Sequence, residues 1–124
     1  NFVKLIGYQN NVFSFLERSK CFILSSLWED PGFVLLEAGF SNTFVISSDC
    51  KSGPNEILEN GKGGLLFINN DIESLKKKIR EYLNLKDKDM KQMKINVKKN
   101  IKKYSLIRHY KLLTKLIYDQ ENLI

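Results

Sequence analysis

A stretch of twenty residues, Cys21–Phe40, constrains the fold of this chain more than any other part of it. It starts with the short apolar run Cys21–Leu24, which is typical of a buried strand. Pro31-Gly32 then breaks the chain, and the almost wholly apolar run Phe33–Phe40 favours the start of a buried helix. The stretch therefore predicts a strand, a polar turn and a helix N-terminus, whose N–H groups and partial positive charge face the turn.

Two carboxylates border the turn and the helix, Glu29 and Glu37, and seven residues separate them. Because burying an unpaired carboxylate is costly, we expect Glu37 to have hydrogen-bond donors, supplied by the protein or by a ligand. A ribose or a hexose suits it, since a carboxylate accepts hydrogen bonds from two neighbouring hydroxyls. The alternatives are a structural ion pair for Glu37 and a solvated position for Glu29. Trp28, beside the first carboxylate, is expected to pack in the core.

Strand and helix patterns alternate along the chain, which is the mark of a parallel, doubly wound α/β sheet. The prediction is an α/β fold with a Rossmann-like parallel sheet and flanking helices. The expected strands are Phe2–Ile6, Cys21–Leu24, Phe44–Ile46 and Leu65–Ile68. The expected helices lie within 10–20, 33–40, 55–59 and 88–104 and after Ser105, and a further helix, with apolar positions from Ile72 to Tyr82, follows a cap at Asn69-Asn70-Asp71.

Three polar turns follow the predicted strands, at Gly7-Tyr8-Gln9, Ser25–Gly32 and Ser47–Gly53. In sheets of this kind, ligands bind outside the carboxyl ends of the strands. We therefore expect all three turns at one edge of the sheet, with the acidic pair at the middle one.

With 124 residues, the chain is one domain or less. It has no apolar run of the roughly 20 residues that cross a bilayer, and its N-terminus has no signal-peptide pattern. The absence of an initiator Met suggests a fragment. Cys21 and Cys50 lack metal-ligand spacing and read as reduced thiols of a cytoplasmic protein rather than as a disulfide.

The basic charge is concentrated in one segment. Residues 76–115 carry 15 Lys/Arg against 3 Asp/Glu, whereas residues 1–75 carry 5 against 9. One interpretation is a solvated face of Lys-rich helices. Another is attraction to an anionic membrane surface, to which each nearby Lys or Arg contributes about 1 kcal/mol. Nucleic acid is not expected, because no recognised motif or aromatic platform accompanies the charge.

The segment from Phe2 to about Leu75 resembles the C-terminal, donor-binding domain of GT-B glycosyltransferases, specifically the retaining group 1 family (family 4). An E-x7-E pair alone would be a weak signal, but several pieces occur here in the family's order. Residues 3–8 resemble the strand that ends in Gly before the nucleotide base, residues 21–26 the strand that leads to the E-x7-E motif, and residues 29–38 that motif. Residues 44–57 resemble the next strand and helix, and residues 61–75 the last strand and the helix after it. The resemblance implies a partial domain, with βα repeats over 1–85 and Lys-rich C-terminal helices over 86–124.

The resemblance also implies roles for individual residues. Glu29 would be the catalytic carboxylate that contacts hydroxyls of the transferred sugar, and Glu37 would bind the ribose of a nucleotide-sugar donor. Asp30 and the amides around Gly32-Phe33 would face the sugar and diphosphate, as helix N-termini do for anions. Gly7-Tyr8 would lie beside the base. Many members have Gly-Phe-Gly after the first Glu, whereas Pro31 here has no N–H to donate, so one amide contact to the sugar is absent or moved.

The implied reaction is transfer of a hexosyl group, with retention, from a nucleotide sugar to a glycan or lipid-linked acceptor. The resemblance implies no cofactor and no obligatory metal, the donor being a substrate. The loop at 48–54 resembles members that use a uridine nucleotide with an N-acetylhexosamine. The family's domain starts with two further strands and an Arg and a Lys that neutralise the diphosphate. These would precede Asn1, so this chain alone is expected to be inactive.

A second hypothesis is a non-catalytic α/β domain that binds a membrane surface or a protein partner through its basic helices. The expected location of the protein is the cytoplasm, and this hypothesis adds peripheral attachment to the cytoplasmic face of the membrane. A sheet that lacks its first strands also has an exposed edge, which invites pairing with another chain and hence oligomers.

Overall fold

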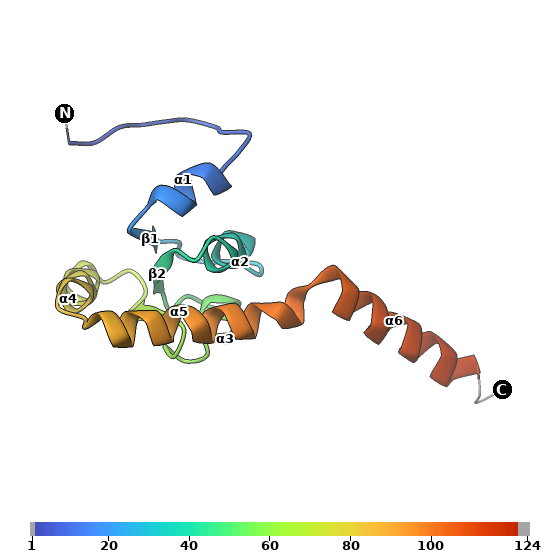
Figure 1. Cartoon of the computed structure of the whole chain (residues 1–124). Coiled ribbons are helices and arrows are strands. Elements are labelled where there is room, and N and C mark those ends of the chain that lie inside the picture. The colour runs from blue at the N-terminus through green and yellow to red at the C-terminus, as the bar shows by residue number, and fades with distance from the viewer. Residues whose placement is uncertain (1, 122–124) are drawn as a thin grey trace.

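The structure is a computed structural model that describes residues 2–121, without the side chains of residues 120 and 121. Strands and helices alternate through the first two thirds of the chain, and helices alone form the last third (Figure 1). The elements are α1 (Phe13–Arg18), β1 (Cys21–Leu24), α2 (Phe33–Phe40), β2 (Phe44–Ser48), α3 (Pro54–Ile57), β3 (Leu65–Phe67), α4 (Ile72–Leu83), α5 (Asp87–Ile101), the 3-10 turn η1 (Lys102–Tyr104) and α6 (Leu106–Glu121).

The three strands form one parallel sheet in the order β1-β2-β3. Ile46 of β2 pairs with Ile23 of β1 on one side and with Leu65 of β3 on the other. Every residue of the central strand β2 is buried, as expected for a parallel strand covered on both faces. This confirms the predicted α/β class and the parallel sheet with flanking helices.

Alternation along β2 divides the core into two layers. Val45 points to the layer formed with α2, α3 and the C-terminal half of α5, and Phe44 and Ile46 point to the layer under α4. The first half of α5 reaches the second layer through Met90 and Met93. Helix α5 therefore contributes to both layers and joins them.

Helix α2 packs closely against α5 because Gly39 has no side chain. A Cβ atom on Gly39 would lie 2.9 Å from Cδ1 of Ile101 and 3.4 Å from Cγ2 of Val97. Asn100, on the same stretch of α5, donates hydrogen bonds from Nδ2 to the carbonyl oxygens of Glu56 (2.9 Å) and Ile57 (2.8 Å). Helix α5 thus fixes α2 by packing and α3 by hydrogen bonding.

The predicted strand Phe2–Ile6 is wrong. The segment is irregular, and its apolar side chains are exposed, with Leu5 97% accessible. An extended run becomes a strand only when another backbone completes its hydrogen-bond ladder. In the part of the chain that the structure describes, β1 pairs with β2 alone, and no backbone pairs with this segment.

Strand β2 is longer than the predicted Phe44–Ile46, because it includes Ser47 and Ser48, which the sequence pattern assigns to a polar turn. Both serines are buried, and their hydroxyls have acceptors. Ser47 Oγ donates to the carbonyl of Ser48 (3.0 Å), and Ser48 Oγ donates to the carbonyl of Ser26 (2.6 Å). A polar side chain therefore enters the sheet once its hydrogen bond is made inside the protein.

Helix α6 leaves the body of the molecule at η1 and extends away from it (Figure 1). Its apolar side chains are at least half exposed at several positions, which include Leu106, Ile107, Tyr110 and Leu116. None of the helices described for residues 2–121 has the length and apolarity that a bilayer span requires.

Candidate functional site

The loop Ser25–Gly32 begins where β1 ends, at the carboxyl edge of the sheet. Neighbouring strands hold it through two of its carbonyl oxygens. Ser48 Oγ, at the end of β2, donates to Ser26 at 2.6 Å, and Asn69 Nδ2, just after β3, donates to Leu27 at 2.8 Å. The ends of all three strands therefore meet at this loop, as the sequence predicts for a ligand-binding edge.

The loop after β2 lies directly against this first loop. A Cβ atom on Gly53 would collide with the carbonyl group of Pro31, and Gly53 has a positive φ of 98°. Two of the three polar turns that the sequence predicts at one edge of the sheet are thus in contact there. The predicted turn at Ser47–Gly53 is shorter than expected, because Ser47 and Ser48 belong to β2.

Helix α2 starts at the end of the loop with no side chain capping its N-terminus. Gly32, the N-cap residue, is buried and has φ 84°, and the N–H of Leu35 bonds its carbonyl at 2.9 Å. The remaining first-turn N–H groups, with the positive end of the helix dipole, are directed at the space above the loop. An anionic group placed there would be stabilised by both.

Glu29 lies against this N-terminus. Its Oε2 atom is 3.5 Å from the position of a Cβ on Gly32. Glu37 lies on α2, five residues after Gly32 and four residues after Phe33. The side chains of Phe33 and Glu37 therefore share one face of the helix. Both glutamates are half-buried, and among residues 2–121 no hydrogen bond or ion pair engages either carboxylate.

The other predicted site residues of this loop are accessible. Asp30 is exposed, and Phe33 is 66% accessible. Trp28 is 61% accessible, so the prediction that it packs in the core is wrong. The loop carries Trp28 past the end of β1, where neither core layer reaches it. The structure therefore brings Glu29, Asp30, Gly32, Phe33 and Glu37 together on one loop and one helix start.

Gly7 and Tyr8 do not join this group. No strand precedes them, Tyr8 is 90% accessible, and no heavy atom lies within 4 Å of a Cβ built on Gly7. The prediction that their turn lies at the edge of the sheet is wrong, because it depended on the strand Phe2–Ile6, which the structure does not contain.

The sequence interpretation missed the part that Asn69 plays at this edge. It was read only as part of the cap of α4, yet its amide fixes the loop at Leu27, and its Oδ1 atom is buried without a hydrogen-bond partner in the described chain. The available signal was the position of Asn69 directly after a strand, which places a polar side chain at the ligand-binding edge.

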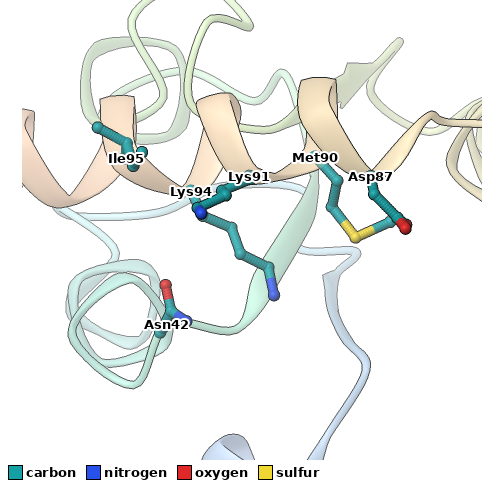
Figure 2. A pocket seen from close by; sticks show the side chains of 6 residues that line it. All are labelled: Asn42, Asp87, Met90, Lys91, Lys94 and Ile95. Carbon is teal, nitrogen blue, oxygen red and sulfur yellow. The ribbon is translucent and has the colours of Figure 1, made fainter.

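A pocket at the opposite end of the sheet is lined by Asp87, the first residue of the one Asp-x-Asp sequence of the chain, Asp87-Lys88-Asp89. These aspartates lie in the first turn of α5. Asp87 lines a cavity of about 360 Å³ with Lys91, Lys94 and Asn42, and Asn42 precedes the amino end of β2 (Figure 2). In the chain as described, no three His, Cys, Asp or Glu side chains gather as a metal site. This cavity is therefore separate from the loop that carries Glu29.

Both cysteines are free thiols in the structure, as predicted, and Cys50 is buried. Burial raises the pKa of the Cys21 thiol from 9.0 to about 11, although a backbone hydrogen bond with Ile46 and the charge of Lys94 act in the opposite direction. Cys21 is thus a neutral packing residue at the amino end of β1, not a nucleophile at the site.

Comparison with known proteins places this chain in a family. Residues 1–100 match the model of the family described as glycosyl transferases group 1. An uncharacterised glycosyltransferase of Methanocaldococcus jannaschii is 53% identical over 58 residues, which are 47% of this chain and 14% of that protein.

Two other relatives have more specific names. The poly(ribitol-phosphate) alpha-N-acetylglucosaminyltransferase of Staphylococcus aureus is 33% identical over 82 residues, 66% of this chain and 17% of that protein. The UDP-Gal:alpha-D-GlcNAc-diphosphoundecaprenol alpha-1,3-galactosyltransferase of Escherichia coli is 36% identical over 70 residues, 56% of this chain and 18% of that protein. The chain therefore spans less than a fifth of the length of these relatives.

Solved structures share the fold. The crystal structure of TarM superposes with a TM-score of 0.70 at 28% identity, covering 86% of this chain and 22% of that one. A glycosyltransferase from Rickettsia africae superposes with a TM-score of 0.81 at 18% identity, covering 91% of this chain and 30% of that one. With a family match over residues 1–100 and a fold that agrees with it, this chain belongs to the group 1 glycosyltransferase family.

Proposed function

We propose that this chain is the donor-binding part of a retaining, family 4 glycosyltransferase, within the C-terminal domain of its GT-B fold. The observation that carries the proposal is the pair of carboxylates without protein partners, Glu29 and Glu37, beside the uncapped start of α2. A half-buried carboxylate without a donor gains most from a ligand that brings hydroxyl groups.

The chemistry of a nucleotide sugar matches the order of groups along the loop. The uncapped N-terminus at Gly32 and Phe33 suits the diphosphate, with Asp30 and Glu29 at the hydroxyls of the transferred sugar. Glu37, farther along α2, accepts from the two ribose hydroxyls. Within this proposal Gly7 and Tyr8 contact the base only if their segment folds against the site when the donor binds.

The proposed reaction transfers a hexosyl group to a hydroxyl of a glycan or lipid-linked acceptor. The hydroxyl oxygen forms a bond to the anomeric carbon on the face from which the diphosphate departs. The bond between the anomeric carbon and the diphosphate oxygen breaks, its electron pair stays on that oxygen, and the hydroxyl proton passes to the departing diphosphate. The uncapped amides at Gly32 and Phe33 stabilise the charge that develops on the departing diphosphate. We propose UDP as the nucleotide, in line with the UDP-Gal in the name of the Escherichia coli relative.

Binding of the donor is testable on this chain by NMR. We expect UDP and UDP-N-acetylglucosamine, but not GDP, to shift the amide signals of Glu29–Glu37. Glu37→Gln keeps the size of the side chain and removes its charge, so it should weaken UDP binding about tenfold. Glu73→Gln is the matched control, because Glu73 is an exposed glutamate at the start of α4.

The result that contradicts the proposal is a folded sample whose Glu29–Glu37 amides respond to no nucleotide, or one in which Glu73→Gln and Glu37→Gln weaken binding equally. The proposed lack of a metal requirement is tested in the same titration. Addition of EDTA should leave UDP affinity unchanged, and a loss of affinity that Mg²⁺ restores would refute it.

A second candidate function is attachment to the cytoplasmic face of a membrane through α6. The observation in its favour is that α6 exposes apolar residues on one side and carries Arg108, Lys111 and Lys115 on the other. Vesicles of phosphatidylglycerol should then broaden the NMR signals of α6, and Lys111→Glu with Lys115→Glu should abolish the effect. Vesicles that leave α6 unchanged would remove this candidate.

A further inference from the structure

Two consecutive carbonyl groups hold the loop Ser25–Gly32 to the ends of the neighbouring strands. The carbonyl of Ser26 accepts from Ser48 Oγ at 2.6 Å, and the carbonyl of Leu27 accepts from Asn69 Nδ2 at 2.8 Å. Ser48 is buried within β2, whereas Asn69 lies two residues after the end of β3. The contact made by Asn69 is therefore the one that reaches beyond the strands and into the loop.

Asn69 provides the last hydrogen bond of the loop before Glu29. Among residues 2–121, no hydrogen bond engages residues 28–31, and the next fixed point is Gly32, the N-cap residue of α2. Leu27 and Glu29 are two residues apart, which is at most about 7 Å of chain. The position of Glu29 thus depends on one anchor at Leu27 and another at Gly32.

Packing holds Leu27 only weakly. Its side chain is 64% accessible, and it lines a cavity of about 140 Å³ together with Ile72 and Leu75 of α4. The space between the loop and the helix is therefore not filled, and an unfilled space offers no contact atoms. Apolar contacts do not replace the hydrogen bond from Asn69 when that bond is lost.

The other end of the Asn69 amide indicates that its contact contributes little to stability. The Oδ1 atom is buried without a hydrogen-bond partner in the described chain. A buried acceptor without a donor costs at least as much free energy as one hydrogen bond gains. The effect of Asn69 is therefore on where the loop lies rather than on how stable the fold is.

Glu37 is held in place independently of Asn69. It belongs to α2, which packs against α5 where a Cβ atom on Gly39 would lie 2.9 Å from Cδ1 of Ile101. A displacement of the loop at Leu27 would therefore move Glu29 and leave Glu37 where it is. The two carboxylates have separate supports, and only the support of Glu29 includes Asn69.

We propose that Asn69 is a positioning residue for the sugar that the donor carries. By holding the carbonyl of Leu27, it keeps Glu29 at the sugar hydroxyls, whereas the contact of Glu37 with the ribose does not depend on it. This inference rests on the proposed donor-binding function and deepens it. Loss of the Asn69 amide lowers the affinity for the sugar part of the donor and leaves the affinity for the nucleotide part unchanged.

The test is an NMR titration with UDP and with UDP-N-acetylglucosamine, on the native chain and on two variants. Asn69→Ala removes the amide, and Asn69→Asp keeps its shape but has no N–H to donate. In both variants, the ratio of the affinity for UDP-N-acetylglucosamine to that for UDP should fall about fivefold, which corresponds to one hydrogen bond. In Asn69→Ala, the affinity for UDP itself should stay within about twofold of the native value.

The matched control is Asn70→Asp, which makes the same change from amide to carboxylate one residue later. Asn70 is exposed, its side chain makes no hydrogen bond within the described chain, and its φ of 58° is one that aspartate tolerates. Its added charge should weaken both ligands equally and leave the ratio of affinities at the native value. A fall of the ratio in Asn70→Asp as large as in Asn69→Asp would assign the effect to charge and overturn the inference.

A measurement without ligand distinguishes positioning from stability. In Asn69→Ala, the heteronuclear NOE values of the backbone amides of residues 28–30 should fall, those of residues 34–40 should stay at the native level, and the urea midpoint should change little. Unchanged values at residues 28–30 would overturn the inference. So would a large loss of stability with a native ratio of affinities, because Asn69 would then be a structural residue only.

The native chain separates a failure of this inference from a failure of the function on which it rests. If the native chain binds neither UDP nor UDP-N-acetylglucosamine, the donor-binding function is wrong and the role of Asn69 is wrong with it. If the native chain binds both and Asn69→Ala keeps the native ratio of affinities, the donor-binding function stands and only the role of Asn69 is wrong.

Discussion

The carbonyl oxygen of Pro31 occupies the space that a Cβ atom on Gly53 would need. The two residues belong to the loops that follow two neighbouring strands, β1 and β2. Gly53 is also the N-cap residue of α3, and its carbonyl accepts the N–H of Ile57 at 2.8 Å. The absence of one side chain thus sets how closely α3 approaches the loop that carries Glu29.

We predict that Gly53→Ala weakens both stability and donor binding. The new Cβ meets backbone atoms that have no rotamer to change, and the φ of 98° is unfavourable for alanine, which adds about 1–3 kcal/mol of strain. Urea unfolding should report the loss of stability, and UDP titration should report weaker binding. Gly61→Ala is the control, because Gly61 also has a positive φ but its nearest atom, the carbonyl oxygen of Gly64, is 3.7 Å away. Equal UDP affinity in the two variants would contradict the prediction.

Asn100→Ala should lower the free energy of unfolding by about 2–3 kcal/mol. It removes the donor for two carbonyl oxygens at the end of α3 from a position that is only 8% accessible, and unpaired buried acceptors cost about 1–3 kcal/mol each. Asn96→Ala provides the comparison, since Asn96 also donates to a carbonyl, that of Lys62 at 2.9 Å, but at an exposed site. Urea denaturation should give a loss below about 1 kcal/mol for Asn96→Ala, and similar losses for both variants would contradict the role of burial.

Asp71→Ala should destabilise the chain by about 1 kcal/mol through loss of the N-cap of α4. The Asp71 carboxylate accepts the N–H of Ser74 at 2.9 Å, and the Ser74 hydroxyl accepts the N–H of Ile68 at 2.9 Å. Asp71→Asn retains a capping oxygen and should lose far less. Thermal unfolding followed by circular dichroism distinguishes the two, and an equally large loss in Asp71→Asn would mean that charge, not capping, is responsible.

The raised pKa of Cys21 predicts a loss of stability at alkaline pH. Below pH 9 the thiol is protonated in the folded and unfolded states, so the shift has no effect. Between its ordinary pKa of 9.0 and the folded value of about 11, the unfolded chain loses a proton that the folded chain keeps. Because the folded state then binds more protons, the free energy of unfolding falls as pH rises through this window, by a total on the order of 2 kcal/mol.

Cys21→Ala isolates this effect from the titration of lysines and tyrosines. The difference in unfolding free energy between the native chain and Cys21→Ala should be constant up to pH 9. Between pH 9 and about 11, the unfolding free energy of the native chain should fall relative to that of Cys21→Ala. Alkylation of the Cys21 thiol by iodoacetamide should remain slow through the same range. A constant difference, or alkylation that accelerates near pH 9, would contradict the raised pKa.

Local patterns in the sequence were sufficient for β1 and α2. Both have the predicted bounds, Cys21–Leu24 and Phe33–Phe40, because each is an apolar run with polar or helix-breaking residues on both sides. The contact between Gly53 and Pro31 could not be predicted, since it depends on how closely two loops approach after the strands have paired. Spacing in the sequence places residues on an edge but gives no distance between loops.

The failed predictions concern residues whose surroundings lie outside their own segment. Phe2–Ile6 has the composition of a strand, yet a strand exists only with a partner. Trp28 was placed in the core on the frequency of buried tryptophans, but the loop carries it beyond the sheet. The acidic pair and the start of α2 could be predicted because they lie within one continuous segment.

Helix α6 joins the rest of the described chain at its N-terminal end, so a small rotation at that junction displaces its far end most. Its sixteen residues, Leu106–Glu121, correspond to a rod about 24 Å long, attached at one end through η1. A rotation of about 10° at Ser105 would displace the far end by about 4 Å but would move Leu106 hardly at all. Small changes in the torsion angles of residues 102–105 therefore decide where Lys115 and its neighbours can reach. The hydrogen bond from Tyr104 to Glu56 holds the end of η1, so such a rotation would begin at the next residue, Ser105.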